Sequence, residues 1–321
     1  MTTTVGGTST ALIEEVGTPA PAAGPPTSTR RILTAMIRDK GAVLCILFLA
    51  IVVLMAVAAP LITKISGWGP YEFDSSAINS ALGGVPHGAL GGISAEHWFG
   101  VEPQNGRDLF ARIVYGARVS ITISLSATVL TGILGVVLGM LAGFYRGWVD
   151  QVISRLMDFL MAFPALIFMI AILSSLPAGN RPVLLVVVIS AFGWPYLARV
   201  IRGQTMTLAN REFVEAARAS GAKDVQVVFR EILPNLRGSI IVMTTLAIPG
   251  YIGTEAGLSF LGVGVSPPTA SWGQMIASSV SWYSVDPMFF VIPGAFLFLT
   301  VLSLTVLGDK IRSVIDQGEA P

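Results

Sequence analysis

Few residues of this chain are suited to catalysis, and their spacing excludes the common enzyme chemistries. The 321 residues include only two histidines, His87 and His97, and one cysteine, Cys45. Neither histidine lies in a His-Glu-x-x-His sequence or at membrane depth, which excludes an intramembrane zinc protease or Ser-His dyad. No lysine lies in the Gly-x-x-x-x-Gly-Lys-Ser/Thr sequence of a P-loop. We therefore expect no catalytic residue, no metal site and no cofactor in this chain, and we interpret both histidines as ordinary loop residues.

Two acidic residues lie in or beside apolar stretches, where an ionised group is costly. Two interpretations of Glu255 are open. Its carboxylate lines an outer vestibule in the path of a substrate, or it accepts hydrogen bonds from backbone N–H groups around Leu258–Gly262. Asp158 lies three residues after Arg155, on the same helix face, and we predict a structural ion pair between them rather than a proton relay.

The segment 199–237 is the most basic part of the chain. Glu212–Ala219 are mostly good helix formers, and Gly221 permits a left-handed turn after them. Ala216 and Ala217 are small, so another surface can approach the backbone closely. A second apolar stretch ends at three residues that lead into the next helix: Ile232, Leu233 and Pro234. The pattern predicts either a short helix–turn–helix that docks on another surface or an ordinary amphipathic helix at the membrane interface.

The composition indicates the class of fold that positions these residues. Apolar residues make up 53% of the chain, charged residues 12%, and the mean hydropathy is +0.73. The charged share is about half that of an ordinary soluble domain, so too few polar residues remain to cover the apolar surface. The formal net charge is +1, which gives no basic field for a nucleic acid. We predict an all-α polytopic membrane protein, because lipid cannot satisfy unpaired backbone groups.

Six stretches with few or no charged residues are long enough to cross a bilayer, which takes about 20 residues. They are Gly41–Thr63, Val119–Tyr145, Phe159–Asn180, Pro182–Ala198, Gly238–Thr254 and Pro287–Gly308. We expect the first to be an uncleaved helix rather than a signal peptide, because its apolar run continues past the small-residue site Ala56–Ala58.

The distribution of Lys and Arg residues between the loops predicts that both termini lie in the cytoplasm. In that orientation fifteen of these residues fall in inner segments and five in outer segments. The exceptions nearest a span are Arg112 and Arg118. The chain then divides into a disordered tail (1–29), a first span and extracytoplasmic loop (30–118), a five-helix core (119–312) that contains the cytoplasmic loop 199–237, and a cytoplasmic tail (313–321).

Glycines and prolines predict how the spans pack and where they bend. Gly135, Gly139 and Gly143 recur every four residues and form a stripe suited to close helix packing. Pro164 and Pro195 are expected to kink the third and fourth spans. A short helix is expected in the outer loop near 107–115.

The uncharged segment after the fifth span cannot continue as a helix through Pro267 and Pro268. We expect a re-entrant or interfacial outer loop with aromatic residues at headgroup depth. A gate, a docking surface for an external protein and a structural plug all remain open. The candidate residues are Ser259, Phe260, Leu261, Gly262 and Trp272.

These stretches together resemble a known family. Glu215-Ala216-Ala217, Gly221 and the ending Ile232-Leu233-Pro234 resemble the EAA motif of ABC importer permeases. Other matching stretches narrow the resemblance to the second permease subunit of the dipeptide/oligopeptide subfamily. They include Gly106-Arg107-Asp108, Tyr115-Gly116-Ala117-Arg118, Phe163-Pro164 and Leu258-Ser259-Phe260-Leu261-Gly262.

The resemblance implies a six-helix fold of the type I ABC importer permeases in the inner (cytoplasmic) membrane of a bacterium. It implies a second homologous permease subunit, two cytoplasmic ATPase subunits that use ATP and Mg, and an extracytoplasmic substrate-binding protein. The EAA loop would enter a cleft of an ATPase subunit. The expected cargo is di- or oligopeptides, and relatives also carry nickel chelates or oligosaccharides.

Two other classes remain as alternatives. An ion-coupled secondary transporter needs ionisable groups inside the membrane, and only Glu255 and Asp158 qualify. A non-transporting scaffold or receptor subunit is the other.

Overall fold

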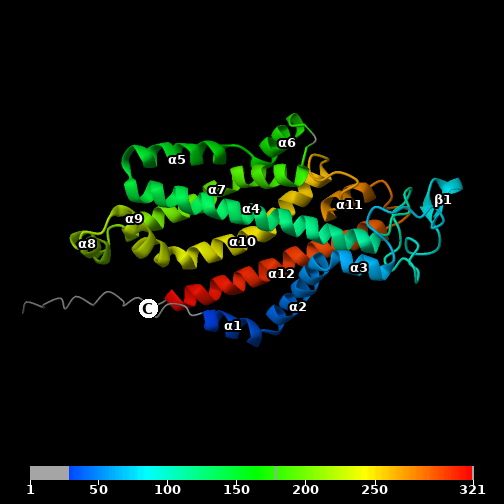
Figure 1. The fold of residues 1–321 in the computed structure, drawn as a ribbon, viewed down its shortest axis with the longest axis horizontal. Helices are drawn as coiled ribbons and strands as arrows, with labels where there is room; N and C mark the ends of the chain where they lie inside the picture. Colours follow the sequence, from blue (N-terminus) through cyan, green and yellow to red (C-terminus); the bar gives the residue numbers. More distant parts are fainter. Residues whose placement is uncertain (1–28, 178, 320–321) are drawn as a thin grey trace, which may run out of the picture.

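The chain folds into a bundle of long helices that lie lengthwise beside one another, with a loop-rich cap at one end (Figure 1). This computed structural model describes residues 29–177 and 179–319, so nearly all of the predicted tail 1–29 lies outside the described residues. The all-α prediction is confirmed. In the described part, β1 (Ile78–Asn79) and β2 (Val85–Pro86) form a single short antiparallel pair in the cap. We call this end the cap end and the opposite end, which holds α8 (Glu212–Ala219), the α8 end.

Six spans are confirmed if one broken helix pair counts as a span. The five unbroken candidates are α2 (Lys40–Val57), α4 (Leu109–Tyr145), α7 (Arg181–Leu208), the continuous stretch Asp224–Phe260 and α12 (Met288–Glu319). The broken pair is α5 (Gly147–Ala162) and α6 (Ala165–Ser175). The stretch Asp224–Phe260 comprises α9 (Asp224–Gln226), a π-helical turn (Val227–Ile232) and α10 (Leu233–Phe260). The shorter helices are α1 (Thr29–Arg38), α3 (Ala59–Ser66), a 3-10 turn (Ser80–Leu82) and α11 (Trp272–Ser279).

Two helices extend beyond the uncharged runs, because a charged residue ends an uncharged run without ending a helix. The short helix expected near 107–115 is in fact the start of α4, which begins at Leu109. Asp108 caps it by accepting a hydrogen bond from the Ala111 backbone N–H at 2.6 Å. Similarly, α12 continues to Glu319, so most of the predicted tail 313–321 is helical.

The third span breaks at Pro164, as predicted, with a bend of 88° between α5 and α6. Proline lacks a backbone N–H and restricts the residue before it, so Phe163 is extended and α6 restarts after Pro164. Pro195, by contrast, lies inside α7, which remains one helix element. Only the first of the two prolines separates helices.

The glycine stripe of α4 packs against α7, as predicted. A β-carbon at Gly135 would lie 2.9 Å from the Leu197 side chain, and one at Gly143 would lie 2.6 Å from the Arg202 carbonyl oxygen. At Gly139 the same atom would lie 2.7 Å from the Ala198 carbonyl oxygen. Without β-carbons at these positions the two helix backbones approach closely, which forms the rigid centre of the bundle.

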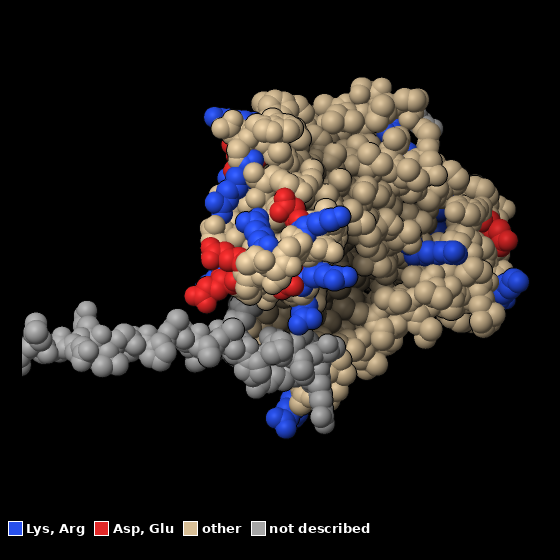
Figure 2. Space-filling model, turned by 60° about the vertical axis from the view of Figure 1, so that its left-hand side comes forward, with Lys and Arg blue, Asp and Glu red and all other residues tan. Residues whose placement is uncertain are grey.

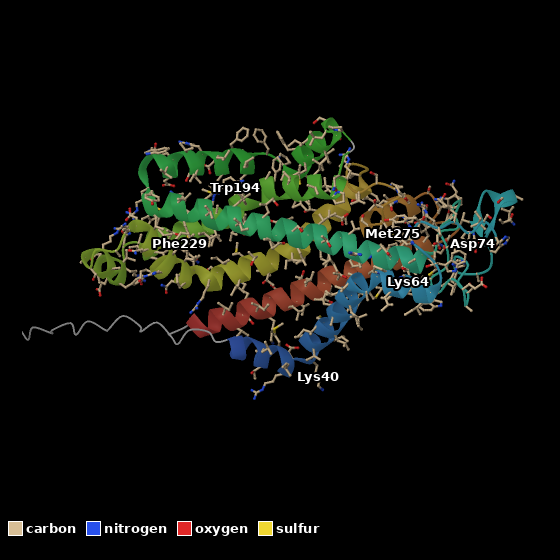
Figure 3. The ribbon with its side chains drawn as sticks, in the orientation of Figure 1. Lys40, Lys64, Asp74, Trp194, Phe229 and Met275 are labelled. Carbon is tan, nitrogen blue, oxygen red and sulfur yellow. The ribbon has the colours of Figure 1, made fainter. Side chains whose placement is uncertain are left out.

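The two ends of the bundle hold different segments. Phe229 lies near the α8 end and Asp74 lies in the cap (Figure 3). The α8 end also holds the link between α4 and α5 and the last turns of α12, whereas the cap end holds α3 and α11 (Figure 1). The link between α4 and α5, α8 and the last turns of α12, which all belong to segments predicted to be inner, therefore lie toward one end.

Candidate functional site

The EAA residues form a helix and a tight turn. Glu215, Ala216 and Ala217 lie in α8, and Gly221 follows with a φ of +85°. The Gly221 N–H donates to the Arg218 carbonyl at 2.9 Å, and the Ala222 N–H donates to the Ala217 carbonyl at 3.0 Å. These bonds satisfy the last carbonyls of α8, and glycine adopts the left-handed conformation without a steric penalty. The predicted helix and left-handed turn are confirmed.

One buried side chain seats α8 on the bundle. Val214 is fully buried in an apolar cluster with Ile201, Val227 and Ile232. The Arg218 guanidinium lies 5.1 Å from the ring centroid of Phe144 on α4, a cation–π contact. The opposite surface of α8 is open, and Glu215 and Ala216 are exposed. The helix is thus held from one side and presents the other.

The second half of the EAA segment is continuous with a span. Ile232 is buried, Leu233 is half-buried and Pro234 is exposed in the first turn of α10. The π-helical turn that ends at Ile232 runs directly into α10, so the second half of the segment and the span form one continuous stretch. Single π turns inside α-helices are frequent at functional sites. The Gly221 turn joins α8 to this stretch.

Charged side chains gather at the α8 end. Figure 2 brings this end forward and shows blue and red groups clustered there, beside a surface that is mostly tan. Exposed charged residues of the segment include Glu212, Glu215, Arg218, Lys223, Asp224 and Arg230. Such a mixed, solvated surface around small residues suits docking of a protein partner rather than contact with lipid tails.

Glu255 is fully buried on α10. The Ser120 hydroxyl of α4 donates to one of its carboxylate oxygens at 2.8 Å, and the Ser259 hydroxyl donates to the other at 2.8 Å. Ser259 in turn accepts from the Val265 N–H at 3.0 Å. The carboxylate thus joins α4, α10 and the loop after α10. These contacts favour the structural interpretation, with serine hydroxyls in place of the expected backbone N–H groups.

The other residues of the predicted outer site separate into two groups. Ser259 and Trp272 are buried, and the Trp272 indole N–H donates to the Ile113 carbonyl at 3.2 Å. The Trp272 ring therefore packs inside the protein rather than on its surface. Phe260 and Leu261 are exposed, and Gly262 turns the chain with a φ of +80°.

The acidic residues of α5 pair with α7 rather than with their own helix. The Arg199 guanidinium lies 2.6 Å from the Asp158 carboxylate, and Arg202 pairs with Asp150. The predicted pair of Asp158 with Arg155 is therefore wrong. Helix spacing allowed that partner, but the packing of α5 on α7 provides a closer one.

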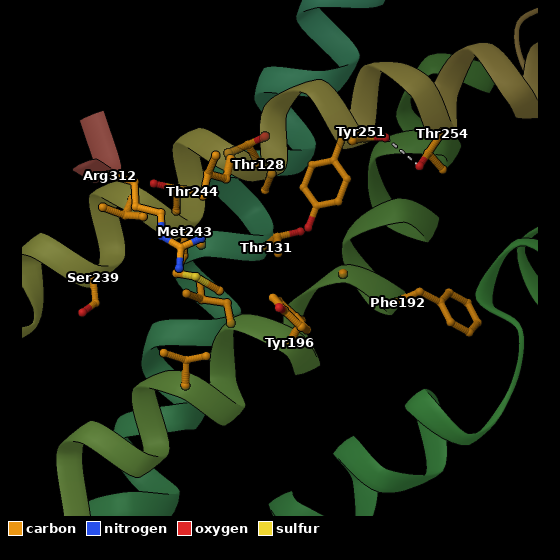
Figure 4. Close-up of a pocket in the computed structure, with 18 of the residues that line it drawn as sticks. Thr128, Thr131, Phe192, Tyr196, Ser239, Met243, Thr244, Tyr251, Thr254 and Arg312 are labelled. Carbon is orange, nitrogen blue, oxygen red and sulfur yellow. Dashed lines mark hydrogen bonds between the residues drawn. The ribbon is translucent and has the colours of Figure 1, made fainter. Parts of the chain in front are cut away.

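A cavity of about 660 Å³ lies between α4, α7, α10 and α12 (Figure 4). It extends from Arg312 and Gln204 toward the α8 end to Tyr251 and Thr254 toward the cap. Its polar lining consists mainly of hydroxyl and amide groups, and Arg312 is the single charged residue in it. Glu255 does not line it.

Comparison with known proteins assigns this architecture. The family described as "Binding-protein-dependent transport system inner membrane component" matches residues 135–319, which include α8, Gly221 and most of the residues that line the cavity. The chain belongs to this family. It is an integral membrane permease of the ABC importer class, whose members work with ATPase and substrate-binding partners.

Curated relatives cover most of this permease. It is 36% identical over 285 residues to the oligopeptide transport system permease protein OppC of Bacillus subtilis (strain 168), covering 88% of each chain. It is also 36% identical over 279 residues to the glutathione transport system permease protein GsiD of Escherichia coli O6:K15:H31, covering 87% of each. Both relatives are transport permease proteins.

A solved structure supports the fold. This permease is similar to a chain of the MetNI methionine ABC transporter in an inward-facing conformation, with a TM-score of 0.51 and 18% identity. The match covers 63% of this permease and 96% of that chain. At this identity the similarity establishes the fold alone.

The cap of the permease contains a buried histidine whose role the sequence did not reveal. His97 lies with one ring nitrogen 2.9 Å from the Asp108 carboxylate and the other 3.2 Å from the Asp74 carboxylate. Trp68 packs on the ring at a centroid distance of 4.7 Å. Since Asp108 caps α4, His97 ties the loop to the start of that span. The interpretation of His97 as an ordinary loop residue is wrong.

The pKa values of the Asp108 and Asp74 carboxyl groups are shifted in opposite directions. Burial raises the pKa of the Asp108 carboxyl above its ordinary value, against hydrogen bonds from Ala111 and His97. Hydrogen bonds from Ser76, followed by His97, lower the pKa of the Asp74 carboxyl. The imidazole thus bridges a carboxylate that resists ionisation and one that favours it.

Arg112 is the second buried centre of the cap. It forms an ion pair with Glu102, which also binds Arg107, and it donates to the carbonyls of Pro70 and Pro268 at 3.2 Å. It also donates to the Gln274 side chain at 2.9 Å. This explains how an arginine lies at the disfavoured end of the second span: its charge is paired inside the protein.

The partners of His97 and Arg112 can be identified only from the folded structure. Phe99-Gly100 and Gly106-Arg107-Asp108 already mark this part of the loop as family-like, and His97 and Glu102 lie beside these stretches. Their partners at Asp74, Pro268 and Gln274 are distant in the chain.

Proposed function

We propose that this chain is the transmembrane permease subunit of an ATP-driven importer for di- and oligopeptides. The observation that carries the proposal is α8: a small-residue helix, closed by Gly221 and seated by Val214, presented at one end of the bundle and joined through the Gly221 turn to the stretch that continues into α10. ATP-driven closure of a partner would move α8, and the rigid helix would carry that motion toward the cavity.

The proposed assembly contains a second homologous permease subunit, two ATPase subunits that bind ATP and Mg²⁺, and an extracytoplasmic binding protein. This chain would be a transport subunit without enzymatic activity. The α8 end faces the cytoplasm in this proposal, in the cytoplasmic membrane of a bacterium, with both termini on that side. The basic residues of the predicted inner segments support this orientation.

Peptide cargo is supported by relatives named for oligopeptide and glutathione transport. The lining of the cavity suits such cargo, since hydroxyl and amide groups can bind main-chain N–H and C=O groups of many peptides. In the described residues no group of three or more His, Cys, Asp or Glu is arranged to hold a metal ion.

The decisive experiment is uptake by the reconstituted complex. The chain is co-expressed with its ATPase, second permease and binding protein, placed in vesicles, and supplied with a radiolabelled tripeptide. We expect uptake that requires ATP and the binding protein and persists when ionophores collapse all ion gradients. Uptake abolished by the ionophores would instead establish an ion-coupled transporter, and a complex that forms without any uptake would indicate a scaffold.

A further inference from the structure

Three buried threonines of the described structure do not donate their hydroxyls to a carbonyl of their own helix. They are Thr131, Thr205 and Thr300, and each is at least nine-tenths buried. Thr131 is the one that lines the cavity. The other threonines of the cavity wall that Figure 4 labels are satisfied by their own helices: Thr128, Thr244 and Thr254 donate to Ser124, Ile240 and Gly250. Thr131 is therefore the cavity threonine with hydrogen-bonding capacity left to offer.

Tyr251 provides a second polar group at the same point. Its hydroxyl, on α10, points toward Thr131 on α4 and forms a hydrogen bond with the Thr131 hydroxyl (Figure 4). That bond uses one of the two hydroxyl hydrogens, so the pair keeps one donor for a ligand. Gly193 of α7 leaves the room, since a β-carbon there would lie 2.3 Å from the Tyr251 hydroxyl and 3.2 Å from that of Thr131. Three helices thus converge on two hydroxyls, where any larger residue at position 193 would displace the phenol.

These two hydroxyls lie at the end of the cavity that is nearer the cap. Toward the cap, Tyr251 and Phe192 pack on an apolar cluster that includes Leu258 and Val265. The polar groups farther toward the α8 end already bind one another, as the Gln204 amide does when it donates to the Ser239 hydroxyl at 2.7 Å. A substrate that occupies the cavity therefore meets a pair of hydroxyls, with one donor left to offer, where the polar wall ends.

We propose that Thr131 and Tyr251 form a polar subsite that binds a main-chain amide group of the peptide in transit. The subsite rests on the proposed function, and it gives a reason for tolerance of different side chains. A hydroxyl accepts from an amide N–H and a phenol donates to a carbonyl, whatever the side chains are. The cavity volume of about 660 Å³ lies within the usual range for small-ligand sites.

The test compares two isosteric substitutions in the full reconstituted importer. Thr131→Val removes the hydroxyl in the cavity, and Thr300→Val removes a similarly buried hydroxyl outside it. We expect Thr131→Val to reduce the maximal rate of tripeptide uptake about threefold to tenfold, the effect of one hydrogen bond, and Thr300→Val to leave it unchanged. Equal basal ATPase activity in all complexes shows that each variant has assembled.

Thr131→Ser separates hydrogen bonding from packing, because it keeps the hydroxyl and loses the methyl group. We expect uptake close to that of the parent. If Thr131→Val transports at the parental rate, or if the serine variant is impaired as much as the valine variant, the subsite is refuted. These results leave the proposed function intact, whereas a parent complex that imports no peptide refutes both.

A peptide analogue sharpens the result. Replacing one amide of the tripeptide by an ester removes a single N–H donor. If the hydroxyl of Thr131 accepts from that N–H, the Thr131→Val effect disappears with one of the two ester analogues, while the binding protein's preference cancels between parent and variant. An undiminished effect with both analogues contradicts main-chain recognition.

Discussion

The two ends of this permease place their charges in opposite environments. In the cap, Arg112, Glu102 and Asp108 are buried, and His97 is only 3% exposed. At the α8 end, the charges of α8 are exposed, and Val214 is its one buried residue. A buried ion pair is costly to open, because each partner would be left in a low dielectric without compensation. The contacts of α8, one buried valine and a cation–π contact, cost less to break.

The difference indicates a division of labour. The cap joins three distant segments through Arg112 and fixes the start of α4 through Asp108, so it acts as a rigid lid on the bundle. The α8 end keeps its polar groups free for a partner. Substitutions in the cap should therefore act on stability, and those near α8 on coupling.

The largest expected effect is in the cap. Arg112→Gln leaves Glu102 with Arg107 alone and deprives the Pro70 and Pro268 carbonyls of their donor, so we expect a loss of about 3–5 kcal/mol in the free energy of unfolding. Thermal unfolding of the purified complex measures it. Arg118→Gln is the control, because Arg118 is exposed on the same helix. Equal melting temperatures for both variants would contradict a rigid cap.

The corresponding change at the α8 end should act on transport without unfolding the protein. In Gly221→Leu the β-carbon disfavours the φ of +85° and obstructs docking, so we expect uptake to fall at least about tenfold while the permease still inserts. Gly221→Asn, which tolerates the left-handed conformation better, should retain more uptake. Uptake and ATPase activity are measured together; parental uptake by the leucine variant would refute the coupling role.

A smaller effect concerns the pH dependence of the cap. The raised pKa of Asp108 means that the folded state holds its proton more tightly than the unfolded state. Stability therefore falls as pH rises from the ordinary aspartate pKa of about 3.9 through the raised value. The pKa of Asp74 is lowered, so the stability that this carboxylate contributes is lost only as the pH falls below the ordinary aspartate pKa.

Asp108→Asn keeps a good helix cap and removes the titrating group. We expect its melting temperature to fall less between pH 4 and pH 7 than that of the parent, measured in the same detergent. An identical pH profile for both proteins would show that Asp108 does not control the stability of the cap.

The smallest expected effect is at Glu255. Glu255→Gln keeps one oxygen acceptor for the Ser120 and Ser259 hydroxyls, so we expect uptake within about twofold of the parent and an unchanged pH dependence of uptake. A large loss of uptake in a complex with normal ATPase activity would instead return Glu255 to the substrate path.

Local sequence patterns predicted the helices and turns more reliably than the residues at which the helices begin and end. The helix at Glu212–Ala219, the turn at Gly221 and the break at Pro164 follow from propensity and backbone sterics, which act within a few residues. The start of α4 at Leu109 did not follow, because a charge was taken as a boundary, although Glu102 pairs with Arg112 inside the protein.

The sequence alone determined that this protein is an all-α membrane permease and where its EAA motif lies, because apolar content, helix spacing and the motif are local properties of the chain. Only the tertiary structure decided which polar groups are satisfied. Asp158 pairs with Arg199, Glu255 accepts from two serines, His97 joins two aspartates, and the Thr131 hydroxyl meets that of Tyr251. Hydrogen bonds and ion pairs act over a few ångströms, and their partners come from segments that only folding brings together.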